Sequence, residues 1–335
     1  MAKMTIDGLT GFVKTYVDAS KQAGTWTNST NNLVGLLDKI GKQITLDGSF
    51  QDKLPELDGD NLPLGKTIEE YFIDLTLPVS YVDPSDASFD PASAIKPYFP
   101  SVEECSYSYT LGRTIIPTSV KYDDFERACI DSSVAANISG KIMERLANSE
   151  SLYRFQQKKQ MLGNMATKAI AASATYSKLV ENLAVPVDTA TSEAFITELK
   201  KDVETASFAT EGHSLNGSLI GAAPSLTLFV KKGVMPDIQV QALAGAIHAE
   251  QLAIPATIKV VDDFGKIMAA DGTTDVSDKV YAMLIDPRGV KIHSGYRALR
   301  KNENGAGDYV SFFQHSENTG FISKNTFVKI YKIAD

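Results

Sequence analysis

A proline-rich stretch between residues 51 and 100 limits what this chain can fold into. It holds seven of the chain's 13 prolines, together with turn-forming runs such as NLPLG and VDPSD. It also contains TIEEYFIDLTLPVSYV, a run rich in β-branched and aromatic residues that predicts a strand. The flanking residues supply too little apolar surface for a core, and an isolated two-stranded ribbon is only marginally stable in water. The stretch therefore predicts a β-ribbon that is stable only when it packs against a surface formed by other residues.

The composition is that of an ordinary globular protein. Of the 335 residues, 43% are hydrophobic and 22% are charged. No apolar run approaches the roughly 18 residues of a membrane span, and the start, MAKMTIDGLT, lacks the layout of a signal peptide, which predicts a protein that stays in the cytoplasm. The formal net charge of −8 disfavours a dedicated nucleic-acid binder, which needs basic patches that neutralise phosphates.

The stretch EGHSLNG, residues 211–217, raises the question of a catalytic serine. A nucleophile elbow needs a small residue two positions after the serine and a helix directly afterwards. Here Asn216 follows Ser214 by two, the glycine is displaced to Gly217, and SLIGAAPSLTLFV leads into a strand. The stretch favours a surface turn, while a serine hydrolase stays open as an alternative that would pair Ser214 with one of the later histidines, His248, His293 or His315.

Other short motifs also favour structural interpretations. GDNLPLGKT resembles a phosphate loop, but five residues separate Gly59 from Gly65, and Pro63 removes a backbone donor. Cys105 and Cys129 have neither metal nor disulfide spacing and are expected to be small buried thiols. No HExxH occurs, so we expect no metal site. Since the serine and phosphate-loop motifs are also incomplete, we expect no catalytic or cofactor-binding site and no enzyme activity. The basic group Arg297, Arg300 and Lys301 is expected in a solvated loop.

Periodicity predicts an α+β protein with a mixed sheet. One or two modest helices are expected before residue 45. Further helices are expected at 122–148, 151–171, 192–206 and 237–251, and strands at 105–120, 226–230, 257–261, 280–286, 308–315 and 326–333. The helices at 122–148 and 151–171 are expected to be separate.

Three stretches together resemble the major capsid protein of tailed bacteriophages, in particular the version in small phages of Gram-positive bacteria. They are LPLGKTIEEYFID (62–74), DIQVQALAGAIHAEQLAIPATIKVVDDFG (237–265), and the run from VYAMLIDPRGVKIHSGYRAL to DYVSFFQHSENTGFISKNTFVKIY (280–331). The resemblance implies the Hong Kong 97-type capsid fold. It would comprise an N-terminal arm (1–47), an extended β-ribbon loop (48–107), a peripheral domain with a long spine helix (108–184), an axial domain with a mixed sheet (185–300) and strands returning to the peripheral domain (301–335).

The resemblance implies a major capsid protein that self-assembles into an icosahedral shell enclosing double-stranded phage DNA. Its partners would be many copies of itself in hexamers and pentamers, a portal, and a scaffold or decoration protein, with no membrane and no sequence-specific DNA binding. The protein would be assembled in the host cytoplasm and located in the virion. A tail tube or another virion structural protein, an encapsulin-type compartment, and the hydrolase using Ser214 remain alternatives.

The extended loop supplies the candidates for contacts between subunits. Its apolar side chains are expected to be poorly buried in a lone subunit and buried in the shell, and its charges are expected to set the register of the contact. The candidates are Leu64, Ile68, Glu69, Glu70, Tyr71, Ile73, Asp74 and Leu75.

Overall fold

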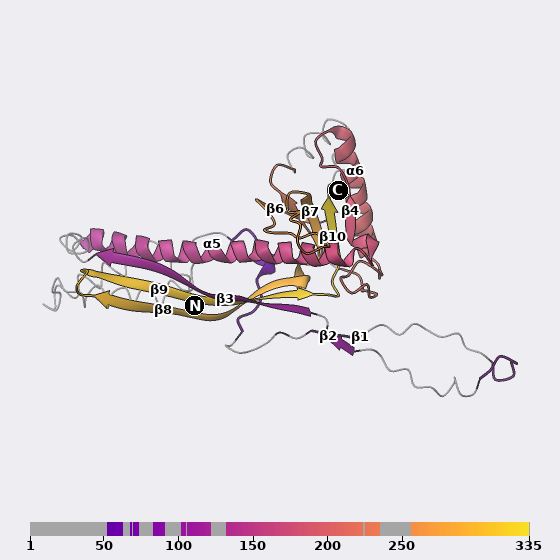
Figure 1. Cartoon of the computed structure of the whole chain (residues 1–335), viewed down its shortest axis with the longest axis horizontal. Helices are drawn as coiled ribbons and strands as arrows, with labels where there is room; N and C mark the ends of the chain where they lie inside the picture. Colours follow the sequence, from indigo (N-terminus) through magenta and orange to yellow (C-terminus); the bar gives the residue numbers. More distant parts are fainter. Residues whose placement is uncertain are drawn as a thin grey trace. The chain divides into compact units, whose positions relative to one another are not determined.

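The computed structural model describes residues 52–62, 68, 70–73, 83–90, 102–104, 106–121, 132–223, 225–234 and 256–334. These residues divide into two compact units (Figure 1). The first unit takes the described residues within 52–66, 109–158 and 292–320, and the second takes those within 67–108, 159–291 and 321–334. The N-terminal arm, the helix expected at 237–251 with His248, Cys105 and Cys129 lie outside the described residues.

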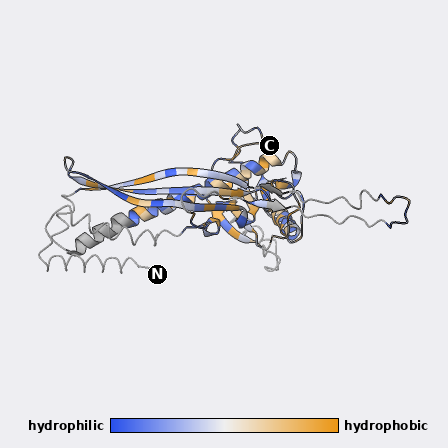
Figure 2. Ribbon diagram, turned by 90° about the horizontal axis from the view of Figure 1, so that it is seen from below, coloured by the Kyte–Doolittle hydropathy of each residue, from blue (hydrophilic) through white to orange (hydrophobic). Residues whose placement is uncertain are grey.

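A three-stranded sheet forms the frame of the first unit. Its strands follow the order β3-β9-β8, with bounds Ser106–Lys121, Tyr309–Ser323 and Val290–Asn304. Polar side chains join β3 to the central strand, since the hydroxyl oxygens of Ser119 and Ser311 lie 2.8 Å apart. Polar and apolar residues mix along these long strands (Figure 2).

Helix α5 spans Ser132–Ala172, which corresponds to about 60 Å at 1.5 Å per residue. The prediction of two helices with a break at 148–151 is therefore wrong. Within the first unit, the Glu150 carboxylate accepts hydrogen bonds from Arg297 Nε at 3.0 Å and from Gln314 Nε2 at 3.4 Å. These partners from β8 and β9 hold the polar run against the sheet, so the helix continues. The solvated loop expected at Arg297 is also wrong, because this residue lies in β8.

The second unit contains a five-stranded mixed sheet, as predicted. Strands β4 and β10 pair in parallel, as do β5 and β6, while β7 pairs antiparallel with both β10 and β5. The order is β4-β10-β7-β5-β6, with bounds Val180–Asn182, Val328–Lys332, Val280–Ile285, Thr227–Lys231 and Thr257–Val261. The strands predicted at 226–230, 257–261 and 280–286 are confirmed. Strands β9 and β10 join different sheets.

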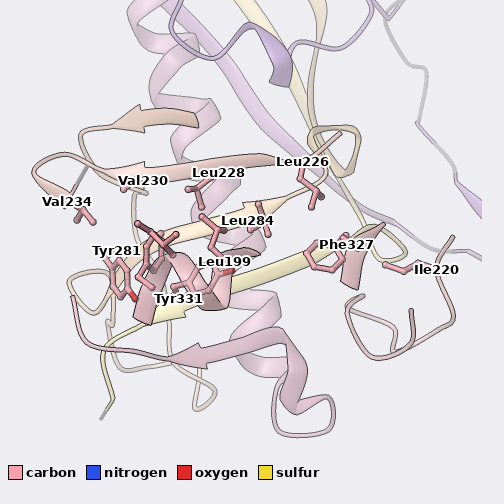
Figure 3. Packing of buried hydrophobic residues seen from close by; sticks show 14 residues of the cluster. Leu199, Ile220, Leu226, Leu228, Val230, Val234, Tyr281, Leu284, Phe327 and Tyr331 are labelled. Atoms are coloured by element: carbon pink, nitrogen blue, oxygen red, sulfur yellow. The ribbon is translucent and has the colours of Figure 1, made fainter. Parts of the chain in front are cut away.

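Helix α6, Thr189–Ala206, covers the core of this sheet and confirms the helix predicted at 192–206. It begins at a capping box in which the Asp188 side chain accepts from the Thr191 backbone N–H. On its buried face, the centre of the Phe195 ring lies 5.2 Å from that of Tyr331, edge-on, and 5.7 Å from that of Tyr281. Figure 3 shows Tyr281 and Tyr331 among the buried hydrophobic side chains of this core. These aromatic contacts fix the helix on the sheet.

Short elements complete the described fold. Strands β1 (Tyr71–Ile73) and β2 (Val102–Glu104) form a separate two-stranded ribbon. Three 3₁₀ turns are η1, η2 and η4, at Pro55–Leu57, Ser177–Leu179 and Pro287–Gly289. None of the helices in the described ranges is long and apolar enough to cross a membrane. The five-part division into domains made from the sequence stays a prediction.

Candidate inter-subunit surfaces

The β1–β2 ribbon is one of the described parts of the predicted extended loop. Its register is antiparallel, with Tyr71 opposite Glu104 and Ile73 opposite Val102. Among the described strands, β1 and β2 pair only with each other. A two-stranded ribbon gains little stability from its own pairing. The side chain of Tyr71 is 63% exposed, the kind of surface that a neighbouring subunit would bury.

Four of the eight contact candidates fall within the described residues. Ile68 and Glu70 are half-buried, Tyr71 is exposed, and Ile73 ends β1. Leu64, Glu69, Asp74 and Leu75 lie outside the described residues.

Glu70 bonds within its own subunit. Its Oε1 accepts a hydrogen bond from the Ser323 hydroxyl at 3.1 Å. Burial raises the pKa of Glu70, although the hydrogen bond from Ser323 works in the opposite direction. Because Ser323 ends β9, this contact ties the start of the ribbon to the second unit. A role in holding the ribbon therefore adds to the role in register that the sequence suggested for Glu70.

Residues 83–90, called here the acidic turn segment, lie midway along the connection between β1 and β2. Asp83 Oδ1 accepts from the backbone N–H and the hydroxyl of Ser85, and Asp86 Oδ1 accepts likewise from Ser88. These hydrogen bonds lower the pKa of both aspartates, so both stay charged. Sequence reasoning missed this segment, although the spacing of Asp and Ser in DPSDASFD is a recognisable signal for successive turns.

A charge cluster around a buried lysine fixes residues 52–62, which lie near the start of the predicted extended loop. Lys158 of α5 is fully buried, and its Nζ contacts carboxylate oxygens of Asp52 and of Asp58, the latter at 2.9 Å. It also donates to the Leu54 carbonyl at 2.8 Å. Arg154, one helical turn earlier, pairs with the second oxygen of Asp58 at 2.7 Å. Two cations and two anions thus balance one another, as buried charges require.

The same segment also bonds to the sheet of the first unit. The backbone N–H of Gly59 donates to the Ile292 carbonyl at 2.9 Å, and that of Leu62 donates to the Ser294 carbonyl at 2.8 Å. A Cβ at Gly59 would lie 2.4 Å from the His293 ring, so any other residue here would displace that ring. The first described residues of the predicted loop are therefore attached to β8 of the same subunit.

In the second unit, the VVDDFG motif after β6 packs on α5. Lys159 Nζ bonds to carboxylate oxygens of Asp262 and Asp263 at 2.9 and 2.8 Å. Phe264 is buried, and its carbonyl would lie 2.4 Å from a Cβ at Gly163. This motif, which contributed to the family resemblance, therefore has a structural role: it attaches the segment that follows β6 to α5.

The EGHSLNG stretch forms a turn, but its centre at His213, Ser214 and Leu215 is buried, which corrects the expectation of a surface location. Ser214 has no exposed surface, and its hydroxyl lies 3.3 Å from the Ser218 carbonyl oxygen. The His213 ring stacks on Phe327 with ring centres 5.1 Å apart. Burial, followed by the charges of Lys329 and Lys178, lowers the pKa of His213 to about 4. A serine without solvent access, with no helix after it, does not form a nucleophile elbow.

The two later histidines that the structure describes belong to the first unit. His293 lies 3.1 Å from the Asp60 carbonyl oxygen, and His315 lies on β9, both in the first unit. Within the ranges that the structure describes, no group of three or more His, Cys, Asp or Glu side chains gathers as metal ligands would.

Comparisons with known proteins agree with this fold. Residues 15–331 match the family described as Phi29-like phage major capsid protein. In the capsid structure of Staphylococcus phage Andhra, a similar chain has 13% identity and a TM-score of 0.60, with 86% of each chain covered. A chain in the structure of the head fibre and inner core protein of bacteriophage P68 has 11% identity and a TM-score of 0.62, with 85% of each chain covered. No curated protein sequence matched.

These structural likenesses confirm the predicted Hong Kong 97-type fold, while the family match covers nearly the whole chain. The family match favours the capsid interpretation over the tail tube, the encapsulin-type compartment and the serine hydrolase. The chain belongs to the Phi29-like phage major capsid protein family, as the resemblance in its sequence predicted.

Proposed function

We propose that this capsid protein self-assembles, through hexamers and pentamers, into an icosahedral shell that encloses double-stranded DNA. The family match over residues 15–331 carries the proposal. A closed shell needs one contact repeated around rings of five and six subunits. Each contact can be weak because many act together.

The extended loop makes the central contact in this proposal. It lies across a neighbouring subunit, which covers the apolar candidates around β1, and Leu64, Ile68, Glu69, Glu70, Tyr71, Ile73, Asp74 and Leu75 form the contact. Full burial of a large apolar side chain is worth about 1.5–3 kcal/mol, so covering the 63% exposed part of Tyr71 contributes about 1–2 kcal/mol per contact. The separate two-stranded ribbon of β1 and β2 supports the proposal, because two strands alone are only marginally stable in water.

The proposed domains follow the sequence-based division. Residues 48–107 form the extended loop, 108–184 the peripheral domain with α5 as its spine helix, and 185–300 the axial domain. Residues 1–47 form an arm that packs on a neighbour, and 301–335 return strands to the peripheral domain. The continuous α5 supports the assignment of the spine helix.

The remaining partners follow from the shell. A portal and a scaffold or decoration protein would join the shell, which assembles in the host cytoplasm and ends in the virion. The chain acts as a structural protein and not as an enzyme. Its net charge of −8 suits a wall that confines DNA without gripping it.

Electron microscopy of the purified protein tests the proposal. The chain is expressed alone and together with the neighbouring genes of its own genome, and negative-stain images are combined with light scattering. Closed shells tens of nanometres across that contain DNA in the phage context are expected. A 36.3 kDa monomer under both conditions, open tubes, or shells filled with protein cargo in place of DNA would contradict it.

Tyr71→Ala tests the contribution of the ribbon. We expect an increase in the protein concentration needed for assembly of about fivefold to thirtyfold, from the 1–2 kcal/mol above and tenfold per 1.4 kcal/mol. Phe208→Ala is the matched control, because Phe208 is an aromatic residue with similar exposure, 66%, outside the loop. Equal effects of both substitutions, with unchanged melting temperatures, would argue against a special role for the ribbon.

A further inference from the structure

The three-stranded sheet of the first unit has one face that does not meet α5. On β9, Gln314 and Asn318 bond to the helix side chains Glu150 and Gln157, so even-numbered positions face the helix. Because side chains alternate along a strand, the odd-numbered position His315 lies on the opposite face.

Two arginines gather on this opposite face. The Arg113 guanidinium, from β3, lies over the Tyr296 ring of β8, with its Cζ 4.5 Å from the ring centre. Arg300, also from β8, donates to the Tyr296 hydroxyl at 3.3 Å. Both arginines are exposed, and both lie near enough to His315 to lower its pKa, after the effect of burial. This group of Arg113, Tyr296, Arg300 and His315 is called here the arginine face.

The arginine face is short of negative charge. Arg113 and Arg300 form no ion pair with a carboxylate in the described part of the chain. Glu317 lies on the same side of β9, two residues from His315, and offsets one of the two charges only in part. Because arginine can bind a carboxylate through two parallel hydrogen bonds, the face is suited to an acidic partner.

The acidic turn segment has the complementary charge. Within the eight residues 83–90 it carries Asp83, Asp86 and Asp90 and no basic residue. Asp83 and Asp86 are exposed, and turns fixed by Ser85 and Ser88 hold their carboxylates in place. A segment ordered in this way loses less conformational entropy on docking than a flexible loop.

We propose that the acidic turn segment of one subunit docks on the arginine face of a neighbouring copy of this chain. The inference rests on the proposed function, since it names the surface that receives the extended loop. The observation that carries it is the charge complementarity of two surfaces in one sequence. DNA is a less suitable partner, because phosphate binding relies on many cations along a surface, whereas this face has two arginines beside Glu317.

Charge reversal in the full chain tests the docking. Arg113→Glu with Arg300→Glu reverses the face, and Asp83→Lys with Asp86→Lys reverses the segment. Each pair is expected to raise the protein concentration needed for assembly at least tenfold, because like charges are then juxtaposed. The chain with all four substitutions restores opposite charges and is expected to assemble within about threefold of the wild-type concentration, by the same argument.

The control reverses two other exposed charges, with Lys201→Glu and Lys232→Glu, and changes net charge as much as the arginine pair does. Melting temperatures show whether each variant folds. The docking would be overturned if both double variants assembled at the wild-type protein concentration. It would also be overturned if the chain with all four substitutions assembled no better than the double variants. A third contrary result is that the arginine variant forms normal shells that no longer contain DNA, because DNA would then be the partner of the arginine face. A wild-type chain that forms no shells would instead refute the proposed function.

Discussion

Replacing Lys158 by methionine is expected to release residues 52–62 from the first unit. Methionine keeps most of the apolar stem of the lysine and removes its charge. The substitution leaves the carboxylates of Asp52 and Asp58 without their shared cation, and the Leu54 carbonyl without its donor. Arg154 still pairs with Asp58, so the cluster is weakened and not abolished.

The cost follows from the burial of the partners. Breaking a fully buried pair by removing one member costs about 3–5 kcal/mol. The Asp52 and Asp58 side chains keep 23% and 36% of their surface in water, so a loss of about 2–4 kcal/mol is expected. At tenfold per 1.4 kcal/mol, local opening becomes about 30-fold to 700-fold more frequent.

Hydrogen exchange followed by mass spectrometry measures this opening directly. The amides of Gly59 and Leu62 bond to β8 and should exchange faster by that factor. Lys159→Met is the matched control, because the adjacent lysine binds Asp262 and Asp263, whose side chains are about half exposed at 48% and 50%. Its cost should stay below about 1 kcal/mol and affect residues 262–266.

Two outcomes would refute this reasoning. Wild-type exchange of residues 52–62 in Lys158→Met would show that the buried charges do not hold the segment. Equal acceleration in Lys159→Met would show that helix destabilisation, and not the cluster, causes the effect.

Two further substitutions probe the second unit. Gly163→Ala places a Cβ 2.4 Å from the Phe264 carbonyl oxygen. The resulting overpacking should lower the free energy of unfolding by about 1–3 kcal/mol in a thermal melt, despite the better helix propensity of alanine. A higher melting temperature would contradict the close approach. The folded-state pKa of His213, about 4, lies below its ordinary value of 6.5, so the unfolded state binds more protons between these pH values and stability falls as pH drops through this range. Between pH 7 and pH 4.5 the loss should be about 2 kcal/mol, and His213→Phe should abolish it in urea titrations at these two pH values; an unchanged pH dependence would exclude His213 as its source.

The strands of the second unit could be predicted because their signal is local. TIKVV and VYAMLI are short runs of β-branched and apolar residues, and both form the expected strands, β6 and β7. Helix α6 carries its own start signal at Asp188. In such elements, neighbouring residues in the sequence determine the structure.

The incorrect predictions concern segments whose structure depends on contacts with residues far away in the sequence. The polar run at 148–151 has low helix propensity, but Glu150 finds Arg297 and Gln314 far along the chain, and α5 continues. EGHSLNG has the composition of a turn, yet the His213 carbonyl accepts from Val328, and the Asn216 amide donates to Lys324. Contacts separated by more than 100 residues leave no trace in local periodicity.

The strand order of the second unit also determines when it can fold during synthesis. Strand β4 pairs only with β10 in its sheet, and Val180 meets Ile330, 150 residues later. At about 5–20 residues per second, the ribosome needs about 8–30 s to cover that distance. Throughout this interval the apolar face of α6 lacks Tyr331, one of the aromatic rings that cover it. The second unit can therefore complete its sheet, and cover this face of α6, only after β10 emerges from the ribosome.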